Sequence, residues 1–351
     1  MAPPAKSCRN SFSAEKQGET LRAIDTGRRL RQHGESVSSL SLSSKQNPDL
    51  VLANPAAGGG IACEALPHLQ KFAVENRWEV EFRGTESSAE FAQIAREEAE
   101  RGRERIFALG GDGTVQLLLN AVAGSPQVSI GVLPAGGGND FASAIGLPND
   151  AVRAAEIVLL HGRASCLDAA HVRTADGTER LYLGGGGVGL DAEAARYASG
   201  AFRKIRGRSR YLLSAVRALW GFQPLNVRVS LDDSAQGVIE AKALLLGVLN
   251  TPSYGAGLRL APEANVQDGK LNLVILQHLP PLEIVRVLAR AAASGEVRTR
   301  YLRRYAIARV RLETDRECVF HGDGEIIGRT PVEVSVVPNA VRVWHPARDK
   351  A

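Results

Sequence analysis

The stretch RIFALGGDGTVQLLLNAVAG, residues 105–124, contains the pattern that decides the fold. Its first part, Arg105–Gly111, is a short apolar run, which predicts a buried strand. The glycine-rich turn GGDGT (110–114) follows, and the apolar spacing of Thr114–Gly124 predicts a helix directly after the turn. A strand, a glycine-rich loop and a helix in this order are typical of one unit of a parallel α/β sheet. Such sheets bind ligands at the carboxyl ends of their strands.

The same alternation extends to both sides of this unit. Further strands are predicted at Asp49–Pro55, Trp78–Gly84 and Val128–Gly136. Helices are predicted between them near Cys63–Asn76 and over Ser87–Gly102, which has a Ser start and a Gly stop. Strands that alternate with helices predict a parallel-sheet α/β domain over residues 48–166, and strands within 330–346 could complete it.

The pattern changes after about Leu167. Segments at 179–189, 225–232, 240–250 and 270–277 are predicted to be strands separated by turns, with only two helices, near Ser209–Trp220 and Leu282–Ser294. This predicts a second domain over 167–329 that is mostly antiparallel β. Residues 1–47 are rich in Ser, Gln, Arg and Lys and predict a disordered N-terminal extension.

The net charge of +5 is small for 351 residues, and most of it lies in the N-terminal tail. Residues 1–47 contain eight Lys/Arg against four Asp/Glu, so the remainder is nearly neutral. This argues against nucleic-acid binding, which needs a basic patch on the folded domain. Two basic clusters without acids, Arg196–Arg217 and Arg298–Arg311, are either solvated faces or surfaces attracted to anionic lipid headgroups.

Targeting and cysteine patterns favour a cytoplasmic protein. No run of about 18 or more apolar residues predicts a membrane span, and the N-terminus lacks the apolar region of a secretory signal. The four cysteines lie far apart and form no CxxC pair, which argues against a zinc ribbon or a disulfide framework. The oligomeric state is left open, a homodimer included.

Three glycine-rich loops each follow a predicted strand of the first domain: NPAAGGG (54–60), GGDGT (110–114) and PAGGGNDFA (134–142). Glycine allows backbone N–H groups to approach phosphate oxygens and to adopt positive φ angles. A following helix adds its positive N-terminal end. A carboxylate among such glycines would repel a phosphate, so its presence there indicates that it binds Mg²⁺ or takes part in a proton transfer. Asp112 is therefore a functional candidate rather than only a turn-capping residue.

The order of the motifs resembles the diacylglycerol kinase catalytic domain family, which includes bacterial lipid kinases and sphingosine kinases. The resemblance rests on NPxxG (54–58), GGDGT (110–114), GxxND-F-A (136–142) and the distant DGE (323–325), and covers about Asp49 to Pro346. The segments 166–172, 184–195 and 249–276 match further family motifs in order. GGDGT alone also occurs in NAD kinases, so the full series singles out the lipid-kinase branch.

This resemblance implies an ATP-dependent lipid kinase of phospholipid biosynthesis, with diacylglycerol as the default acceptor and phosphatidic acid as product. The acceptor would enter between the two domains, with its acyl chains in the β-rich lipid-substrate domain. The protein would associate peripherally with the membrane through its basic clusters. The nucleotide contacts it implies are Asn54, Gly58, Gly59, Thr85, Gly110, Gly111, Gly113, Thr114, Gly136, Gly137, Asn139 and Asp140.

The resemblance also implies catalytic and metal-binding residues. Glu325, the Glu of DGE, would be the general base that accepts the proton of the acceptor hydroxyl. Asp112 would organise the Mg²⁺ of Mg·ATP. Asp268 would hold a second, structural Mg²⁺, and carbonyls near Asn265 and Lys270 would complete that site.

Two positions depart from the family pattern and keep two alternatives open. Ala57 and Gly137 stand where the family has hydroxyl residues, and no Lys follows Gly58. Each hydrogen bond lost to a phosphate costs about 1.5–3 kcal/mol unless a backbone amide replaces it. One alternative is a kinase of a soluble substrate, similar to NAD kinases, and the other is a non-catalytic nucleotide-binding regulatory protein. The retained acidic residues Asp112, Asp140 and Glu325 favour a kinase.

Overall fold

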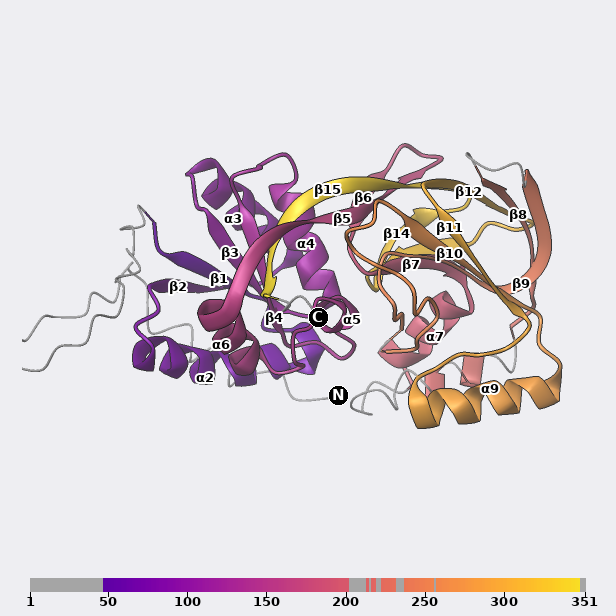
Figure 1. Cartoon of the computed structure of the whole chain (residues 1–351), viewed down its shortest axis with the longest axis horizontal. Helices are drawn as coiled ribbons and strands as arrows, with labels where there is room; N and C mark the ends of the chain where they lie inside the picture. Colours follow the sequence, from indigo (N-terminus) through magenta and orange to yellow (C-terminus); the bar gives the residue numbers. More distant parts are fainter. Residues whose placement is uncertain are drawn as a thin grey trace, which may run out of the picture.

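The computed structural model describes residues 47–201, 213–214, 216–218, 222–231, 237–255 and 257–347. In this part, the chain forms an α/β half and a β-rich half that lie side by side (Figure 1). The predicted N-terminal extension, apart from Asn47, lies outside the described residues. So do most of the predicted helix Ser209–Trp220 and most of the basic cluster Arg196–Arg217.

The α/β half has the predicted parallel sheet. Its strands are β1 (Asp49–Ala53), β2 (Val80–Gly84), β3 (Arg105–Gly110) and β4 (Ser129–Pro134), in the spatial order β2-β1-β3-β4. Helices cover both faces: α2 (Ile61–Glu75) packs against α6 (Ala151–His161), and α3 (Ser88–Glu100) packs against α4 (Asp112–Val122) (Figure 1). All five residues of β1 are buried, as expected for a strand covered by helices on both sides. The short helix α5 (Asp140–Ala144) follows β4.

Two long strands join the halves into one sheet. β5 (Gly162–Thr174) and β15 (Val332–Pro346) pair antiparallel along nearly their whole length and arch over both halves (Figure 1). β15 also pairs parallel with β4 at one end and antiparallel with β12 (Arg309–Thr314) at the other. The predicted boundary between residues 166 and 167 falls inside β5, and the division into domains stays a prediction.

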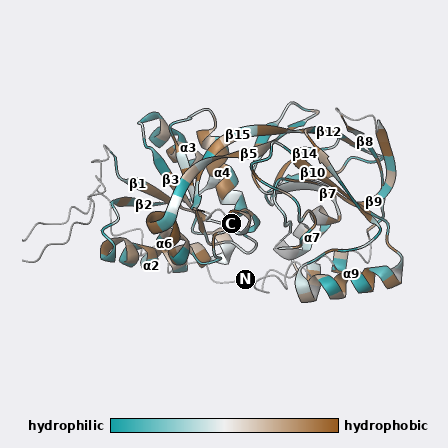
Figure 2. Cartoon of the chain, viewed as in Figure 1, coloured by the Kyte–Doolittle hydropathy of each residue, from teal (hydrophilic) through white to brown (hydrophobic). Residues whose placement is uncertain are grey.

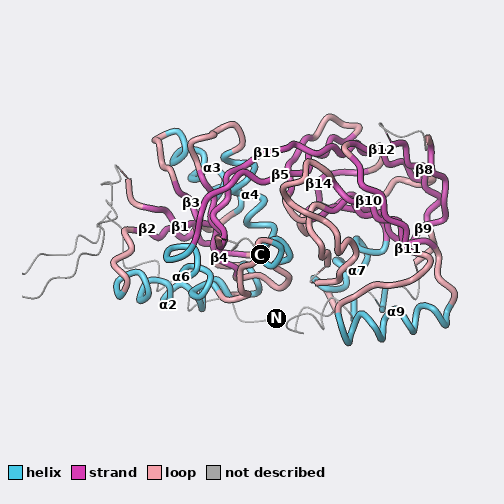
Figure 3. Tube along the Cα trace, in the orientation of Figure 1, coloured by secondary structure: helices cyan, strands magenta, loops and turns pink. Residues whose placement is uncertain are grey.

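The second half is the predicted mostly antiparallel β structure. Its remaining strands are β6 (Glu179–Tyr182), β7 (Gly185–Gly189), β8 (Leu225–Leu231), β9 (Val238–Leu249), β10 (Leu271–Gln277), β11 (Leu302–Ile307), β13 (Val319–Gly322) and β14 (Glu325–Arg329). They bury their own hydrophobic core around Tyr182, Leu246 and Phe320, and hydrophobic residues recur along these strands (Figure 2). Helices α7 (Leu190–Ser199) and α9 (Pro281–Ser294) lie together on one side of the strands (Figure 3).

The expectation of only two helices in the second half is wrong, because α7 is a further one. Its sequence LDAEAARYAS follows a glycine-rich strand without an intervening turn signal, yet its alanines favour a helix. Helix α6 and strands β11 and β12 were also not predicted. The start of α6 had a local signal, since the Asp150 side chain accepts a hydrogen bond from the Arg153 N–H at 2.8 Å.

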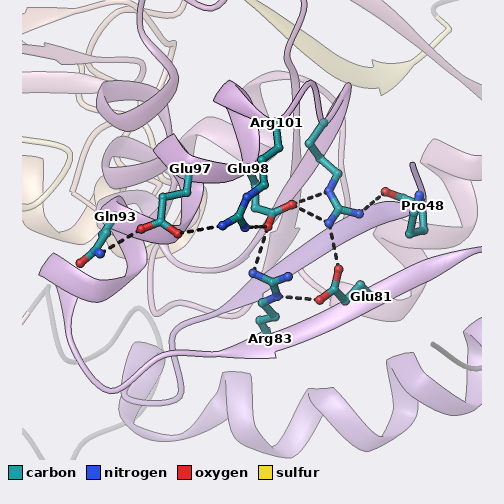
Figure 4. A network of polar contacts seen from close by, with 8 residues as sticks. Pro48, Glu81, Arg83, Gln93, Glu97, Glu98 and Arg101 are labelled. Carbon is teal, nitrogen blue, oxygen red and sulfur yellow. Dashed lines mark hydrogen bonds and ion pairs between the residues drawn. The ribbon is translucent and has the colours of Figure 1, made fainter. Parts of the chain in front are cut away.

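A buried ion-pair cluster fastens α3 to the edge of the sheet (Figure 4). The Glu98 carboxylate, whose side chain is 4% exposed, accepts from Arg103 at 2.5 Å and lies 3.1 Å from Arg83. Arg103 also donates to Glu81 at 2.9 Å and to the Pro48 carbonyl at 2.7 Å. Burial raises the pKa of Glu98, but its bonds to the arginines outweigh this, so the pKa lies below its ordinary value.

Two further observations concern membrane spans and cysteines. Among the described helices, none is long and apolar enough to cross a membrane. Cys63 on α2 is disulfide-bonded, whereas the thiols of Cys166 and Cys318 form no disulfide in the described part of the chain. The argument from sequence against a disulfide framework therefore fails at Cys63. Sequence spacing does not reveal which cysteines approach each other in space.

Candidate active site

The first glycine-rich loop turns sharply between β1 and α2. Gly58 has φ 62°, and a Cβ at this position would lie 2.4 Å from the Ala135 carbonyl oxygen. Only glycine therefore fits where the first and third loops approach each other. The Asn54 side chain donates to the Thr114 hydroxyl at 3.4 Å, which ties the first loop to the second.

The second loop, GGDGT, connects β3 directly to the N-terminus of α4. A Cβ on Gly110 would lie 2.3 Å from Thr114 Oγ1, so glycine is needed for the loop to close onto the helix. Helix α4 begins at Asp112, two residues earlier than predicted, because this residue already has helical geometry after Gly111. The positive end of α4 thus lies at the carboxyl end of β3, where an anion would be stabilised.

The third loop is held in shape by Asn139. This residue has φ 57°, and its side chain accepts from the Gly136 N–H at 3.0 Å and donates to the Gly136 carbonyl at 3.0 Å. The Asn139 amide also donates to the Asn149 side chain. The closed turn places Asp140 at the start of α5, facing the second loop.

Asp112 links the second and third loops through its carboxylate. Its two oxygens accept from the Phe141 N–H at 3.1 Å and the Asp140 N–H at 3.2 Å. Burial, together with the charges of Asp140 and Asp323, raises the pKa of Asp112 to about 7 against the opposing effect of these two hydrogen bonds. Asp140 and Asp323 thus lie near enough for their charges to repel the Asp112 carboxylate, although in the described part of the chain the three are not grouped as metal ligands.

The turn between β13 and β14 brings the terminal DGE motif to the same place. Asp323 accepts from the backbone N–H groups of Leu183, Gly184 and Gly185 at 2.8–3.1 Å. Burial raises the pKa of Asp323 to about 6, against the opposing effect of these three bonds. Asp323 therefore fixes the turn that carries Glu325.

Glu325 lies directly against the second loop. A Cβ built on Gly113 would lie 2.6 Å from Glu325 Oε1. From the neighbouring turn of α4, the Gln116 amide donates to the Gly322 carbonyl at 3.1 Å. Residues 113 and 325 are far apart in sequence, so the two halves of the protein together build this part of the site.

A single cavity of about 560 Å³ connects the loops and carboxylates with an apolar region. At its polar end lie the three glycine-rich loops with Asp112, Asp140, Asp323 and Glu325. At its other end the lining is almost entirely aliphatic and comes from the second half. These aliphatic residues are Leu245, Leu258, Leu260, Leu276, Leu279, Ile284, Val287, Leu288, Ala291 and Val297.

Most of the predicted nucleotide and catalytic residues line this cavity: Asn54, Gly58, Gly59, Gly111, Asp112, Gly113, Thr114, Gly136, Gly137, Asp140 and Glu325. Gly110, Asn139 and Thr85 are not among its lining residues. Gly110 and Asn139 shape the loops, as described above. Thr85 is buried at the end of β2, and its hydroxyl donates to the Ala53 carbonyl at 3.1 Å.

The predicted second metal site lies away from the cavity, in the turn before β10. Asp268 accepts from the Lys270 N–H at 3.0 Å, and Asn265 accepts from the Gln267 N–H at 3.2 Å. Asp168 holds the same turn by accepting from the Gly269 N–H at 2.8 Å. In the described part of the chain no three His, Cys, Asp or Glu side chains are grouped to hold a metal, and the site stays a prediction.

Sequence reasoning missed Asp323, His321 and the aliphatic lining. Asp323 belongs to the same HGDGE segment as Glu325, so proximity in sequence could have indicated it. His321 is buried beside the carboxylates and lines the cavity, and its Nδ1 has no hydrogen-bond partner among the described residues. The aliphatic residues come from separate elements and carry no motif, so no local signal could have found them.

Comparison with known proteins identifies the class to which this fold and site belong. Residues 48–172 match the diacylglycerol kinase catalytic domain, and residues 186–345 match the YegS C-terminal NAD kinase beta sandwich-like domain. The chain therefore belongs to the diacylglycerol kinase catalytic domain family, a family of lipid kinases.

Relatives match over most of their length. A diacylglycerol kinase of Mycobacterium tuberculosis (strain H37Rv) is 28% identical, covering 84% of this chain and 94% of the relative. A probable lipid kinase YegS-like protein of Pseudomonas aeruginosa (strain PAO1) is 30% identical, covering 77% of this chain and 85% of the relative. The crystal structure of a Bacillus anthracis protein is similar in fold, with a TM-score of 0.71 at 21% identity, covering 88% of this chain and 98% of that one.

Proposed function

We propose that this protein transfers the γ-phosphoryl group of ATP to the hydroxyl of diacylglycerol, which gives phosphatidic acid. The observation that carries the proposal is the single cavity of about 560 Å³, which joins glycine-rich loops and carboxylates to an aliphatic pocket. A phosphate-binding end suits a nucleotide, and an aliphatic end suits acyl chains. A soluble acceptor would leave the aliphatic end without a ligand.

The residues at the polar end fit Mg·ATP. The loops supply close-packed glycines and the N-terminus of α4 for the phosphates. Burial and the charges of Asp140 and Asp323 raise the pKa of Asp112, and carboxylate oxygens are the kind of ligand that Mg²⁺ prefers. When bound, Mg²⁺ would neutralise charge on the transferring phosphoryl group. Asp112 and Asp140 would hold it.

Glu325 would act as the general base. It is exposed at the rim of the cavity and lies against Gly113, so its carboxylate can face an acceptor bound between the two ends. In the transition state it would accept the proton of the lipid hydroxyl while the oxygen attacks the γ-phosphorus; the bond from the γ-phosphorus to the β-phosphate oxygen breaks, and ADP leaves. Asp323 would keep Glu325 in position through its bonds to the segment Leu183–Gly185.

Ala57 and Gly137 bear on nucleotide affinity. Both line the cavity, so the missing hydroxyls would have faced a bound nucleotide. Backbone N–H groups of the same loops would then carry those contacts. We infer that the protein binds ATP through main-chain groups more than through side chains.

We also propose that the protein is cytoplasmic and associates peripherally with a membrane, because its substrate resides there. The basic cluster Arg298–Arg311 divides into two parts. Arg309 and Arg311 on β12 pair with Glu333 and Glu313. In the part before β12, Arg298 pairs with Glu296 at 2.9 Å and Arg304 lies 3.9 Å from Glu263.

The test is transfer of label from γ-labelled ATP, with Mg²⁺, to a panel of acceptors. The panel contains diacylglycerol, a sphingoid base and NAD, and Asp112→Ala is compared with wild type. Labelled phosphatidic acid that disappears in the variant supports the proposal. Label on the sphingoid base would show that this lipid, rather than diacylglycerol, is the acceptor. Label on NAD would favour a soluble substrate. Binding of ATP with no transfer would favour a regulatory protein.

A further inference from the structure

Helix α9 forms the outer wall of the aliphatic end of the cavity. Ile284, Val287, Leu288 and Ala291 all line the cavity, and they recur at the spacing of one helix face. Val287 and Ala291 are buried. Among the described residues, α9 therefore separates this part of the aliphatic end from the outer side of the helix.

The opposite face of α9 carries apolar side chains in an exposed position. Leu282 is 64% exposed and Val285 is 63% exposed, and they lie one turn apart. Arg286 and Arg290 are exposed on the same side of the helix. Hydrophobic and hydrophilic residues accordingly alternate along α9 (Figure 2).

The segment after α9 runs back along the helix and adds further arginines. The Arg290 guanidinium donates to the Arg298 carbonyl at 3.1 Å, and the Thr299 hydroxyl donates to the Glu283 carboxylate at 2.8 Å. Glu283, the acid of the first turn of α9, is thereby engaged by Thr299 and also lies 3.6 Å from Arg286. The helix face carries Arg286 and Arg290 against the one carboxylate of Glu283, so it keeps a positive charge.

Beside this segment lies a second, smaller cavity of about 290 Å³. Its lining includes Arg259, Arg298 and Arg304, with Glu296 as the acidic member. Arg304 is fixed there, because its guanidinium donates to the Leu260 carbonyl at 2.5 Å. Arg298 pairs with Glu296 at 2.9 Å and Arg304 lies 3.9 Å from Glu263. The three guanidinium groups outnumber these two acidic partners, and the excess positive charge suits a phosphate.

We propose that the outer face of α9, together with the adjoining arginine-lined cavity, docks the protein onto an anionic phospholipid bilayer. Leu282 and Val285 enter the acyl layer, and the arginines contact lipid phosphates. The inference rests on the proposed function, since the helix that touches the bilayer is also the wall of the acyl-chain pocket. The substrate can then pass from the bilayer into the cavity beside α9.

Charge favours a bilayer over a second copy of the chain as the partner of this face. In a two-fold dimer through α9, the arginines of one protomer would meet those of the other. Lipid phosphates neutralise the same arginines, and the acyl layer accepts Leu282 and Val285. An anionic membrane therefore complements both features of the face.

The first test is co-flotation with vesicles of phosphatidylcholine mixed with phosphatidylglycerol, and with vesicles of phosphatidylcholine alone. Wild type is compared with the double variants Leu282→Ser/Val285→Ser and Arg286→Glu/Arg290→Glu. We expect wild type to bind the mixed vesicles more tightly than the neutral ones. The apolar variant should bind about tenfold more weakly, and the charge variant roughly fivefold more weakly for each arginine.

Matched controls lie on the α/β half. Val74→Ser removes a valine that is 70% exposed on α2, and Arg96→Glu/Arg153→Glu reverses two exposed arginines on α3 and α6. Both controls should float like wild type, and thermal melting of every variant checks the fold. The proposal is overturned if the α9 variants float like wild type, or if the controls lose binding equally. It is also overturned if the α9 variants alter a concentration-dependent dimer instead of vesicle binding.

A second measurement separates the docking surface from the proposed function. Phosphorylation is measured with diacylglycerol embedded in the mixed vesicles and with short-chain diacylglycerol dispersed in water. The α9 variants should lose turnover on the first and keep it on the second. If wild type phosphorylates neither lipid but still floats through α9, the kinase assignment fails and the docking surface holds. Normal turnover of both lipids by the α9 variants overturns the docking surface alone.

Discussion

Glu325 and Gly113 are in such close contact that a single Cβ on the glycine would lie 2.6 Å from the Glu325 Oε1 atom. The glycine belongs to the GGDGT loop of the α/β half, and the glutamate begins β14 of the β-rich half. The site is therefore complete only when both halves are assembled. The absence of a side chain at position 113 leaves room for the carboxylate.

This contact predicts the effect of Gly113→Ala. The new methyl group would displace the flexible end of Glu325 rather than backbone, so stability should change by less than about 1 kcal/mol. The loss of a positioned base should lower kcat by about 10²-fold or more. Gly247→Ala is the control, because its Cβ would meet only ordinary contacts from 3.5 Å outward. Steady-state kinetics with unchanged melting would support the account, and full activity of Gly113→Ala would refute the placement of Glu325.

The raised pKa of Asp112 predicts a dependence of stability on pH. Burial raises the pKa to about 7, so between about pH 4 and pH 7 the folded state binds more protons than the unfolded state. The free energy of unfolding should therefore fall as pH rises through this range. Asp112→Asn removes the buried charge, so it should stabilise the protein on the order of a few kcal/mol near pH 8 and much less near pH 5.

Chemical denaturation of both proteins at several pH values measures this difference. The same substitution should abolish phosphoryl transfer, since the amide cannot replace a carboxylate beside Mg²⁺. A variant that is destabilised equally at all pH values would show that Asp112 is not a strained, buried carboxyl group.

The ion-pair cluster on α3 predicts a large effect for Glu98→Gln. Arg103, whose side chain is 7% exposed, would lose its main charged partner, and unfolding free energy should fall by about 3–5 kcal/mol at neutral pH. Glu97→Gln on the same helix is the control, because its carboxylate is 42% exposed and its removal should change stability by less than about 1 kcal/mol.

The lowered pKa of Glu98 adds a pH criterion to this comparison. A carboxyl with a lowered pKa stabilises the fold above its unfolded pKa and stops doing so as pH falls through the folded pKa. The difference between wild type and Glu98→Gln should therefore shrink below about pH 4. A constant difference across acid pH would mean that the charge of Glu98 is not the cause.

The aliphatic end of the cavity predicts the effect of Ala291→Phe. Ala291 is 9% exposed and lines the cavity, so a phenyl ring there would occupy space assigned to acyl chains. The KM for short-chain diacylglycerol should rise by about tenfold, with Mg·ATP affinity unchanged. Ala293→Phe, on the exposed side of the same helix, should leave both values near those of wild type. Equal effects of the two substitutions would argue against acyl chains in this cavity.

The polar end of the site could be predicted from sequence because each loop carries its own local signal. Runs of glycine after apolar strands mark the loops at Gly58, Gly110 and Gly136, and parallel strands bring their carboxyl ends together. The contact between the DGE and GGDGT motifs could not be predicted from their spacing in the sequence. It depends on how the paired strands β5 and β15 run from one half of the protein to the other. It was available only through resemblance to a family.

The aliphatic end could not be predicted for a different reason. Its lining comes from β9, β10, α9 and the loops around them, and leucines and valines there look like any core residue. Whether Val287 faces a filled core or a cavity depends on packing that no single segment encodes. The helix α7 was missed because alanine-rich composition alone is a weak signal beside strong strand patterns.

The most direct test of the account is the Glu325→Gln variant, assayed for label transfer from γ-labelled ATP to diacylglycerol and for Mg·ATP binding by calorimetry. The account predicts that wild type forms labelled phosphatidic acid. The variant should bind Mg·ATP with nearly unchanged affinity but turn over about 10²- to 10⁴-fold more slowly. Labelled phosphatidic acid formed at the wild-type rate by Glu325→Gln, or formed by neither protein, would contradict it.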